Sequence, residues 1–217
     1  MIHTLLTDSF DHDLDALRAA ADVIRRGGVI AYPTETVYGL GADPFNPGAV
    51  QRVFDLKGRD AAKALILLVG ADADLATVAV EVSEAARSLM KAFWPGPLTL
   101  VLRASPNLPG AILGGTDSVA VRRSSHPVAR GLTHLVAGPI TSTSANRSGR
   151  PPCRSAPEVA ATFRTGLDLI LDGGPSPGGR PSTILDVSRR APALIRPGAI
   201  GRPDLETVLG QPILSPE

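Results

Sequence analysis

The sequence predicts an α/β fold in which a twisted mixed sheet is flanked by helices. Three observations support this prediction. Short apolar runs alternate with segments of helical periodicity, Gly and Pro cluster at the ends of these segments, and the last apolar runs follow one another closely. Alternating strands and helices are typical of α/β proteins. Strands joined by short connections favour antiparallel or mixed pairing.

The predicted helices are identified by apolar residues on one face and by signals at their ends. The first carries Leu14, Leu17 and Ile24 on one face and ends at Gly27-Gly28. Most of the others have a polar cap or a nearby Pro. The predicted helices are 14–26, 46–56 with Asn46 as cap and Pro47 in first position, 83–93, 127–136, and 155–163 with a capping box formed by Ser155 and Glu158.

The predicted strands are short apolar runs between these helices and towards the C-terminus. A run of four or five apolar residues bounded by turn signals is consistent with a buried strand. The predicted strands are 29–32, 65–69, 98–102, 119–121, a strand end at 140, 169–171, 183–187 and 193–195.

Length and composition indicate one globular domain. The chain has 217 residues, of which 43% are hydrophobic and 20% charged, so it can bury a core and is too apolar to be disordered. It contains no internal repeat and no low-complexity linker. We therefore expect a single domain over 1–217, with a core over about 12–200 and a short peripheral tail over 201–217.

Charge and cysteine content exclude several classes of protein. The net charge of +1 argues against a dedicated nucleic-acid coat, although it allows a local cationic pocket. Cys153 is the one cysteine, which excludes an intramolecular disulfide and a Cys-rich metal site. The start lacks a signal-peptide pattern, and no stretch of about 18 apolar residues occurs. We therefore expect a cytoplasmic protein without membrane contact.

Familiar nucleotide-binding and catalytic motifs are incomplete in this chain. Gly39-Leu40-Gly41 follows a predicted strand, but Pro44 stands where a dinucleotide fingerprint needs its third Gly. The loop 174–179 has the spacing of a P-loop, but Arg180-Pro181 follows instead of Lys and Ser or Thr. The four histidines show no metal-ligand spacing, and no GxSxG elbow supports a catalytic triad.

Polar clusters instead lie beside several predicted strands, where ligand sites of α/β folds gather. If their loops converge, the guanidinium groups of Arg, the ammonium groups of Lys and the hydroxyl groups would form a binding site for a polyphosphate. Each cation taken alone could equally be an ordinary surface residue, so the hypothesis depends on their joint occurrence. The clusters are 32–39 (YPTETVYG), 57–59 (KGR) with Lys63, 118–123, 141–149 (TSTSANRSG), 182–183 and 196–198 (RPG).

Within TSTSANRSG, three polar residues share one parity. If the strand end continues through Ser142, Ser144 and Asn146, alternation places all three on one face. Thr141 and Thr143 should then point the other way and matter less.

Seven motifs follow one another in the order YPTETVYGLG, KGR, WPGPLT, VAVRR, TSTSANRSG, DGG followed by ST, and RPG. Together they resemble the YrdC-type threonylcarbamoyl-AMP synthases over about residues 28–198. The resemblance implies a short, single-domain member of that family with one deep cationic cavity. It implies that L-threonine, bicarbonate or CO2, and ATP give threonylcarbamoyl-AMP and pyrophosphate. Mg²⁺ would accompany ATP, with no tightly bound organic cofactor. Other proteins would transfer the group to adenosine 37 of tRNA, and a direct tRNA contact is a further expectation.

The resemblance also implies roles for individual residues. No motif marks the metal ligands. The catalytic tetrad around the nucleotide would be Lys57, Arg59, Ser144 and Asn146. ATP would be bound by Arg59, Lys63, Ser118, Ser144, Asn146 and Arg196. The threonine would be bound by Thr36, Arg122, Ser142 and Ser182, with Arg122 facing its carboxylate.

The chain departs from the family pattern at two places. Leu68 stands where some members carry a His near the threonine, so that contact is lost or replaced. Asp60 and Ala64 replace the prolines that usually follow KGR and precede the next strand, which puts the rigidity of this loop in doubt.

Three alternatives stay open at this point. An RNA-binding module could use the same cavity, but 4% aromatic content and a net charge of +1 disfavour it. A domain of a longer carbamoyltransferase is disfavoured by the single cysteine and the length. A paralogue acting on another amino acid is supported by Leu68, and one methyl group in a pocket contributes only about 1–3 kcal/mol to selectivity.

Overall fold

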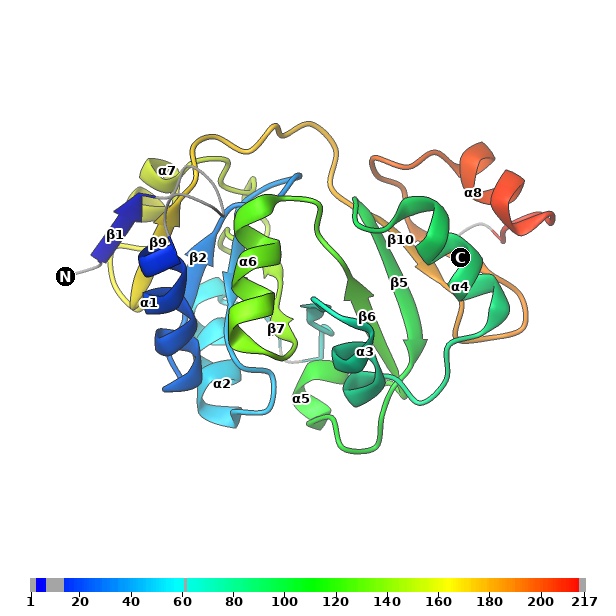
Figure 1. Cartoon of the computed structure of the whole chain (residues 1–217), viewed down its shortest axis with the longest axis horizontal. Coiled ribbons are helices and arrows are strands. Elements are labelled where there is room, and N and C mark those ends of the chain that lie inside the picture. Colours follow the sequence, from blue (N-terminus) through cyan, green and yellow to red (C-terminus); the bar gives the residue numbers. More distant parts are fainter. Residues whose placement is uncertain (1–2, 7–13, 61, 215–217) are drawn as a thin grey trace.

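The protein contains two mixed β-sheets with helices packed around them (Figure 1). The computed structural model describes residues 3–6, 14–60 and 62–214. The first sheet has the strand order β1-β9-β2-β3-β8. Its strands are β1 His3–Leu6, β2 Ile30–Tyr32, β3 Gly39–Gly41, β8 Thr143–Ser144 and β9 Leu169–Asp172.

The second sheet has the strand order β11-β10-β5-β6-β4-β7. Its pairs β5–β10 and β4–β6 are parallel, whereas β5–β6, β10–β11 and β4–β7 are antiparallel. The predicted mixed α/β fold is therefore confirmed, although the prediction placed the strands in one sheet. The strands are β4 Ile66–Leu68, β5 Leu98–Arg103, β6 Ser118–Arg122, β7 Ile140–Thr141, β10 Thr183–Asp186 and β11 Ala193–Arg196.

The helices begin largely where the sequence signals place them. Asn46 caps its helix by accepting a hydrogen bond from the Ala49 amide at 3.1 Å, with Pro47 in first position. At Ser155 the predicted capping box is incomplete, because the Glu158 carboxylate accepts from the Arg154 amide instead of the cap amide. The helices are α1 Leu14–Arg25, α2 Pro47–Lys57, α3 Asp72–Val78, α4 Glu84–Phe93, α5 Gly110–Leu113, α6 Pro127–Val136, α7 Ala156–Thr162 and α8 Arg202–Leu209.

The glycines of GLG belong to a strand that pairs with β2 rather than to a nucleotide-binding turn. A Cβ atom at Gly41 would lie 2.8 Å from the ring of Tyr32, which is fully buried. Glycine at this position lets the strand backbone approach an aromatic ring. This packing explains why the sequence begins like a dinucleotide fingerprint and then departs from it.

Strand alternation in β5 and β6 gives the second sheet one apolar face and one face of mixed polarity. Leu98, Leu100 and Leu102 of β5 point into a core cluster shared with residues of α3, α4 and α8. The intervening Thr99, Val101 and Arg103 belong to neither core cluster. In β6 the same alternation puts Val119 and Val121 in the core, and Ser118, Ala120 and Arg122 on the other face. This second face is where the polar residues of the strands gather.

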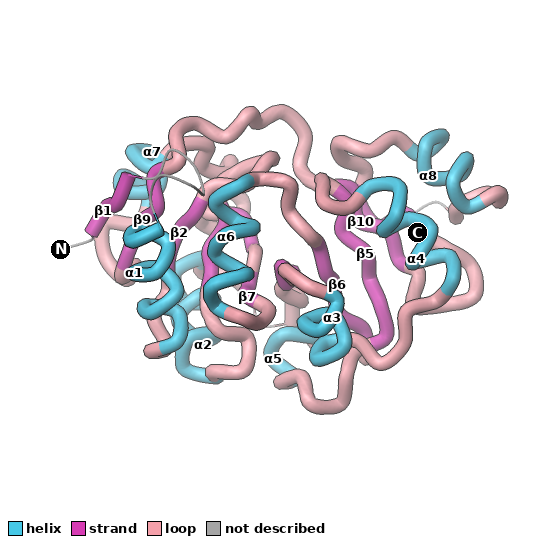
Figure 2. Tube along the Cα trace, in the orientation of Figure 1, coloured by secondary structure: helices cyan, strands magenta, loops and turns pink. Residues whose placement is uncertain are grey.

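In the described part of the chain, the backbone passes between the two sheets three times, first through the connection from β3 to β4 that contains α2. At Ser142 it leaves β7 of the second sheet and enters β8 of the first. Between β9 and β10 it returns through the Gly- and Pro-rich loop 173–182, which runs along the upper edge in Figures 1 and 2. All three connections contain predicted site residues, among them Lys57, Ser142 and Ser182, so the predicted site lies where the sheets meet.

The segment after residue 200 is more than the peripheral tail that the sequence suggested. Within the described residues it forms α8, which packs against α4. Leu205 is fully buried and Ile213 is 2% exposed, and both belong to the larger core cluster. Residues 215–217 and the start of the predicted core at 12–13 lie outside the described part of the chain. Within the described residues, no helix is long and apolar enough to cross a membrane.

Candidate functional site

Lys57 connects the end of α2 to the TSTSANRSG segment. Its side chain is buried, and its ammonium group donates to the Ser144 carbonyl, to the Asn146 carbonyl at 3.0 Å and to Asn146 Oδ1 at 3.1 Å. Ser144 Oγ donates to the same Oδ1 at 2.6 Å. The structure therefore brings together three of the four predicted tetrad residues, and it uses all three donors of the ammonium group.

The loop that follows is fixed from both ends. Asn146 Nδ2 donates to the carbonyls of Arg147 at 2.9 Å and Arg150 at 2.7 Å, and the Ser148 amide donates to the Lys57 carbonyl at 2.7 Å. Gly58 ends α2 in the left-handed region, with φ of 56°, which glycine adopts without strain. The chain can therefore turn at once from Lys57 to Arg59.

Burial, with a smaller contribution from the nearby Arg59 charge, lowers the pKa of Lys57 to about 8.

Arg59 and Lys63 flank the same loop before β4. Arg59 Nη2 donates to the Ala64 carbonyl at 2.7 Å, and burial lowers the pKa of its guanidinium. Asp60 accepts from the Ala62 amide at 2.9 Å through its side chain and from the Lys63 amide at 3.0 Å through its carbonyl. The turn is therefore formed by Asp60 without the usual prolines. The Lys63 side chain is exposed.

A second cationic group lies at the end of β6. Arg122 is 5% exposed, and its Nη1 donates to Thr36 Oγ1 at 3.2 Å. The same Nη1 lies 3.4 Å from Glu35 Oε1, so the guanidinium has a buried carboxylate beside it. Thr36 is itself held by Thr34, whose hydroxyl lies 3.0 Å from the Thr36 hydroxyl. The PTET segment and the VAVRR strand, far apart in sequence, therefore meet at Arg122.

Arg196 forms a third group with two hydroxyls. Its Nη2 donates to the Ser182 carbonyl at 2.8 Å and to Ser182 Oγ at 3.1 Å, and Ser182 Oγ lies 2.8 Å from Thr99 Oγ1. Burial and the nearby charge of Arg122 lower the pKa of Arg196, so the two guanidiniums are neighbours. A Cβ atom at Gly198 would collide with the Pro181 carbonyl and the Thr183 amide, which explains the glycine of RPG.

Ser142 lies near Tyr32, whereas Ser144 and Asn146 are hydrogen-bonded to Lys57. Burial raises the pKa of Tyr32, and a side-chain hydrogen bond with Ser142 and the Arg122 charge partly oppose that effect. Ser142 also donates its amide to the Ile66 carbonyl at 2.7 Å. The parity argument assumed one continuous strand and is wrong in that premise, because the chain changes sheets at Ser142. Ser144 and Asn146 meet through a loop.

Thr141 is a structural residue, in line with the expectation that it points away from the site. Its amide donates to the Ala42 carbonyl at 2.9 Å, and its hydroxyl donates to the Leu40 carbonyl at 3.0 Å. The Ala42 amide donates back to the same hydroxyl at 2.9 Å. Thr141 therefore joins the second sheet to β3 of the first.

Ser118 lies on the polar face of β6, four residues before Arg122, with Oγ 3.2 Å from Thr116 Oγ1. Register places Arg103 of β5 directly opposite it. Arg103 is exposed and has no ion-pair partner in the described part of the chain.

Sequence reasoning missed Glu35, Thr99 and Arg103 as neighbours of these groups. The alternation of LTLVLR could have indicated Thr99 and Arg103, whereas Glu35 lies in the polar cluster 32–39 but received no role.

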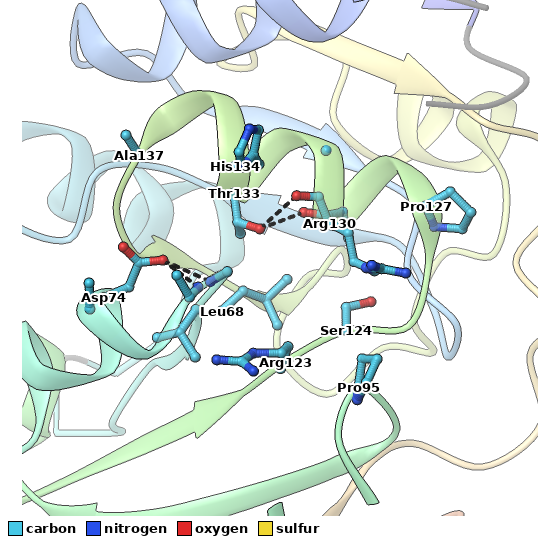
Figure 3. A pocket seen from close by; sticks show the side chains of 16 residues that line it. Leu68, Asp74, Pro95, Arg123, Ser124, Pro127, Arg130, Thr133, His134 and Ala137 are labelled. Atoms are coloured by element: carbon cyan, nitrogen blue, oxygen red, sulfur yellow. Dashed lines mark hydrogen bonds between the residues drawn. The ribbon is translucent and has the colours of Figure 1, made fainter. Parts of the chain in front are cut away.

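A cavity lies beside these groups rather than around them. It measures about 920 Å³ and is lined by the end of β4, the start of α3, the β6–α6 connection and α6. Figure 3 shows Leu68, Arg123, Ser124 and Arg130 among the side chains that line it. Leu68 is 1% exposed and packs with Tyr32 in the smaller core cluster. A deep cationic cavity around the predicted residues stays a prediction.

Known proteins resemble this chain over most of its length. The sequence profile of the Sua5/YciO/YrdC family, described as "Telomere recombination", matches residues 22–198. A protein of Pyrococcus abyssi (strain GE5 / Orsay) named threonylcarbamoyl-AMP synthase is 45% identical over 195 residues, which cover 90% of this chain and 57% of that protein. A protein of the same name from Nitrosococcus oceani is 41% identical over 78% of this chain and 92% of its own length.

The fold agrees with these sequence matches. The structure of P. abyssi Sua5 complexed with L-threonine superposes with a TM-score of 0.92 at 41% identity, covering 99% of this chain and 62% of that one. The chain thus spans about three fifths of the length of these P. abyssi proteins. The extent of the profile match and the shared fold lead to one conclusion: this chain belongs to the Sua5/YciO/YrdC family.

Proposed function

We propose that the chain is an L-threonylcarbamoyladenylate synthase, which condenses L-threonine, bicarbonate or CO2, and ATP to threonylcarbamoyl-AMP and pyrophosphate. The observation that carries the proposal is the presence of two cationic groups, each built from segments far apart in the sequence: Lys57 with Ser144 and Asn146, and Arg122 with Thr36. It is supported by relatives that bear the name threonylcarbamoyl-AMP synthase and by a similar structure complexed with L-threonine.

The two groups suit the two substrates. A buried ammonium, a guanidinium and neighbouring hydroxyls are complementary to the phosphates of ATP. A buried Arg122 beside hydroxyls is complementary to an amino acid carboxylate. We assign Lys57, Arg59, Lys63, Ser118, Ser144, Asn146 and Arg196 to the nucleotide, and Thr36, Arg122, Ser142 and Ser182 to threonine.

The proposed reaction needs no protein nucleophile. The threonine amine forms an N–C bond with CO2 and loses a proton, which gives a carbamate. A carbamate oxygen then forms a bond to the α-phosphorus of ATP, and the bond from that phosphorus to the bridging oxygen breaks, releasing pyrophosphate. Negative charge develops on the phosphates, so the contribution of Lys57 and Arg59 is positioning and electrostatic stabilisation.

Magnesium would arrive with ATP rather than occupy a site made by the protein. Mg²⁺ usually binds through substrate phosphates and one or two carboxylates. Among the described residues, no group of three or more His, Cys, Asp or Glu side chains could hold a metal ion. We therefore treat MgATP as the substrate. The product would be consumed by proteins that transfer the threonylcarbamoyl group to tRNA.

The test is to incubate the purified chain with MgATP, bicarbonate and one amino acid at a time. We expect pyrophosphate release and a threonylcarbamoyl-adenylate mass with threonine, and less product with serine, which lacks one methyl group. Product formed best with another amino acid would support the paralogue. Tight tRNA binding without any turnover would support the RNA-binding alternative, which no structural observation favours at present.

The pKa of Lys57 predicts how nucleotide binding depends on pH. Burial lowers this pKa from its ordinary value to about 8, so the ammonium loses its charge as the pH rises through that value. If ATP binds only the charged form, its KM should rise by up to about tenfold for each pH unit above 8. The measurement is the KM for MgATP between pH 7 and 9.5. Lys57→Arg keeps its charge over this range, so its KM should stay level. Parallel profiles for both proteins would contradict the prediction.

A further inference from the structure

The corner where β6 ends and α6 begins contains an unusual group of unpaired polar atoms. In the described part of the chain, four buried side-chain atoms lack a hydrogen-bond partner: Glu35 Oε1, Arg122 Nε, Arg123 Nε and His126 Nδ1. Buried polar atoms nearly always have a partner, so each exception needs an explanation. Two of the four belong to one ion pair, Glu35 with Arg122, on which the proposed threonine site depends.

Glu35 is anchored through one oxygen and remains free at the other. Its Oε2 accepts a hydrogen bond from Ser124 Oγ, and Ser124 Oγ in turn accepts from the His126 amide at 3.2 Å. Its Oε1 lies 3.4 Å from Arg122 Nη1 without forming a hydrogen bond. Charge-assisted hydrogen bonds are typically about 2.7–2.9 Å long. The carboxylate therefore sits beside the guanidinium without taking up its hydrogen-bond donors.

The burial of this pair makes the carboxylate important for Arg122. The Glu35 and Arg122 side chains are 14% and 6% exposed. A buried guanidinium without a counter-charge is strongly disfavoured, and the neighbouring Arg196 adds a second positive charge. With Glu35 present, Arg122 can stay buried and oriented, and its Nε donor is not taken up by the carboxylate.

We propose that Glu35 is a positioning residue for the amino acid substrate. It holds Arg122 in place through charge, and Ser124 holds Glu35 in place through its hydroxyl. The proposal rests on the proposed function, because it takes Arg122 as the partner of the threonine carboxylate. It predicts that loss of the Glu35 charge weakens the use of threonine and leaves the use of ATP nearly unchanged.

The principal test is Glu35→Gln, which keeps the size of the side chain and an acceptor for Ser124. We expect the KM for threonine to rise by at least about tenfold, and the KM for MgATP by less than about twofold. Ser124→Ala removes the anchoring hydroxyl without changing the charge and should raise the threonine KM by a smaller factor. In the double variant the two effects should not add, because both act through the same guanidinium.

The matched control is Asp72→Asn. Asp72 pairs with the adjacent Arg123 at 2.7 Å, but its side chain is 93% exposed and lies outside the proposed site. We expect its threonine KM to equal that of the original chain. An equal rise in the control would overturn the inference, because the effect would then be a general loss of surface charge.

Other outcomes also decide the matter. A folded Glu35→Gln protein with an unchanged threonine KM, or with equal rises in both KM values, would overturn the inference and leave the proposed function standing. If Glu35→Gln does not fold, an unchanged threonine KM in Ser124→Ala has the same meaning. If the original chain releases no threonine-dependent pyrophosphate, the proposed function fails, and the inference fails with it.

Discussion

Lys57→Ala is expected to lower threonine-dependent pyrophosphate release by at least about 10²-fold, the size of effect that follows the loss of one preorganised electrostatic group beside a developing anion. The ammonium is buried and contacts Ser144 and both oxygens of Asn146, so its charge is fixed at this point. Its loss also leaves buried acceptors unpaired, which costs about 1–3 kcal/mol of stability. The measurement is kcat with saturating substrates.

Two further variants separate charge from structure in this experiment. Lys57→Met keeps most of the buried stem and removes the ammonium, so it should lose activity to a similar extent while unfolding at a higher temperature than Lys57→Ala. Lys91→Ala removes an exposed lysine of α4 and should change neither quantity. Turnover of a folded Lys57→Met protein at the original rate would exclude Lys57 from the mechanism.

Local signals explain why most elements could be predicted from the sequence. Asn46, Ser83 and Ser155 accept hydrogen bonds from amides three residues ahead, so each marks a helix start by a contact within its own segment. Two of the elements that were missed have weak local signals. β3 is built from two glycines and a leucine, and α5 has four residues. Their positions are set by packing, as Gly41 against Tyr32 shows.

From the sequence, the kinds of residue in the site could be predicted, but the contacts between them could not. Lys57 and Asn146 are separated by 89 positions, and Arg122 and Thr36 by 86, so their contacts depend on how the two sheets are joined. The sequence contains no marker for that junction. The parity argument for Ser142 failed for this reason, since a two-residue strand in each sheet replaced one longer strand. Glu35 was missed because its role comes from burial beside Arg122.

Arg122→Lys is expected to lower kcat/KM for threonine by about 10²–10³-fold. Lysine keeps the positive charge, but it lacks the planar fork that pairs with a carboxylate through two parallel hydrogen bonds. Losing one partner of a buried, hydrogen-bonded charge pair typically costs about 2–5 kcal/mol. The loss should appear mainly in KM for threonine, with KM for MgATP little changed. Steady-state kinetics with each substrate varied in turn measures both.

A double variant separates the binding role of Arg122 from its effect on stability. Arg122→Met alone leaves the Glu35 carboxylate buried without its partner, which should destabilise the fold by about 3–5 kcal/mol. Arg122→Met with Glu35→Gln removes both charges, so stability should return towards that of the original chain, because a buried ion pair is often replaceable by neutral groups. Threonine use should stay lost in the double variant, since the carboxylate of the substrate still has no guanidinium to bind. Recovery of stability and threonine KM together would mean that Arg122 acts through the fold alone.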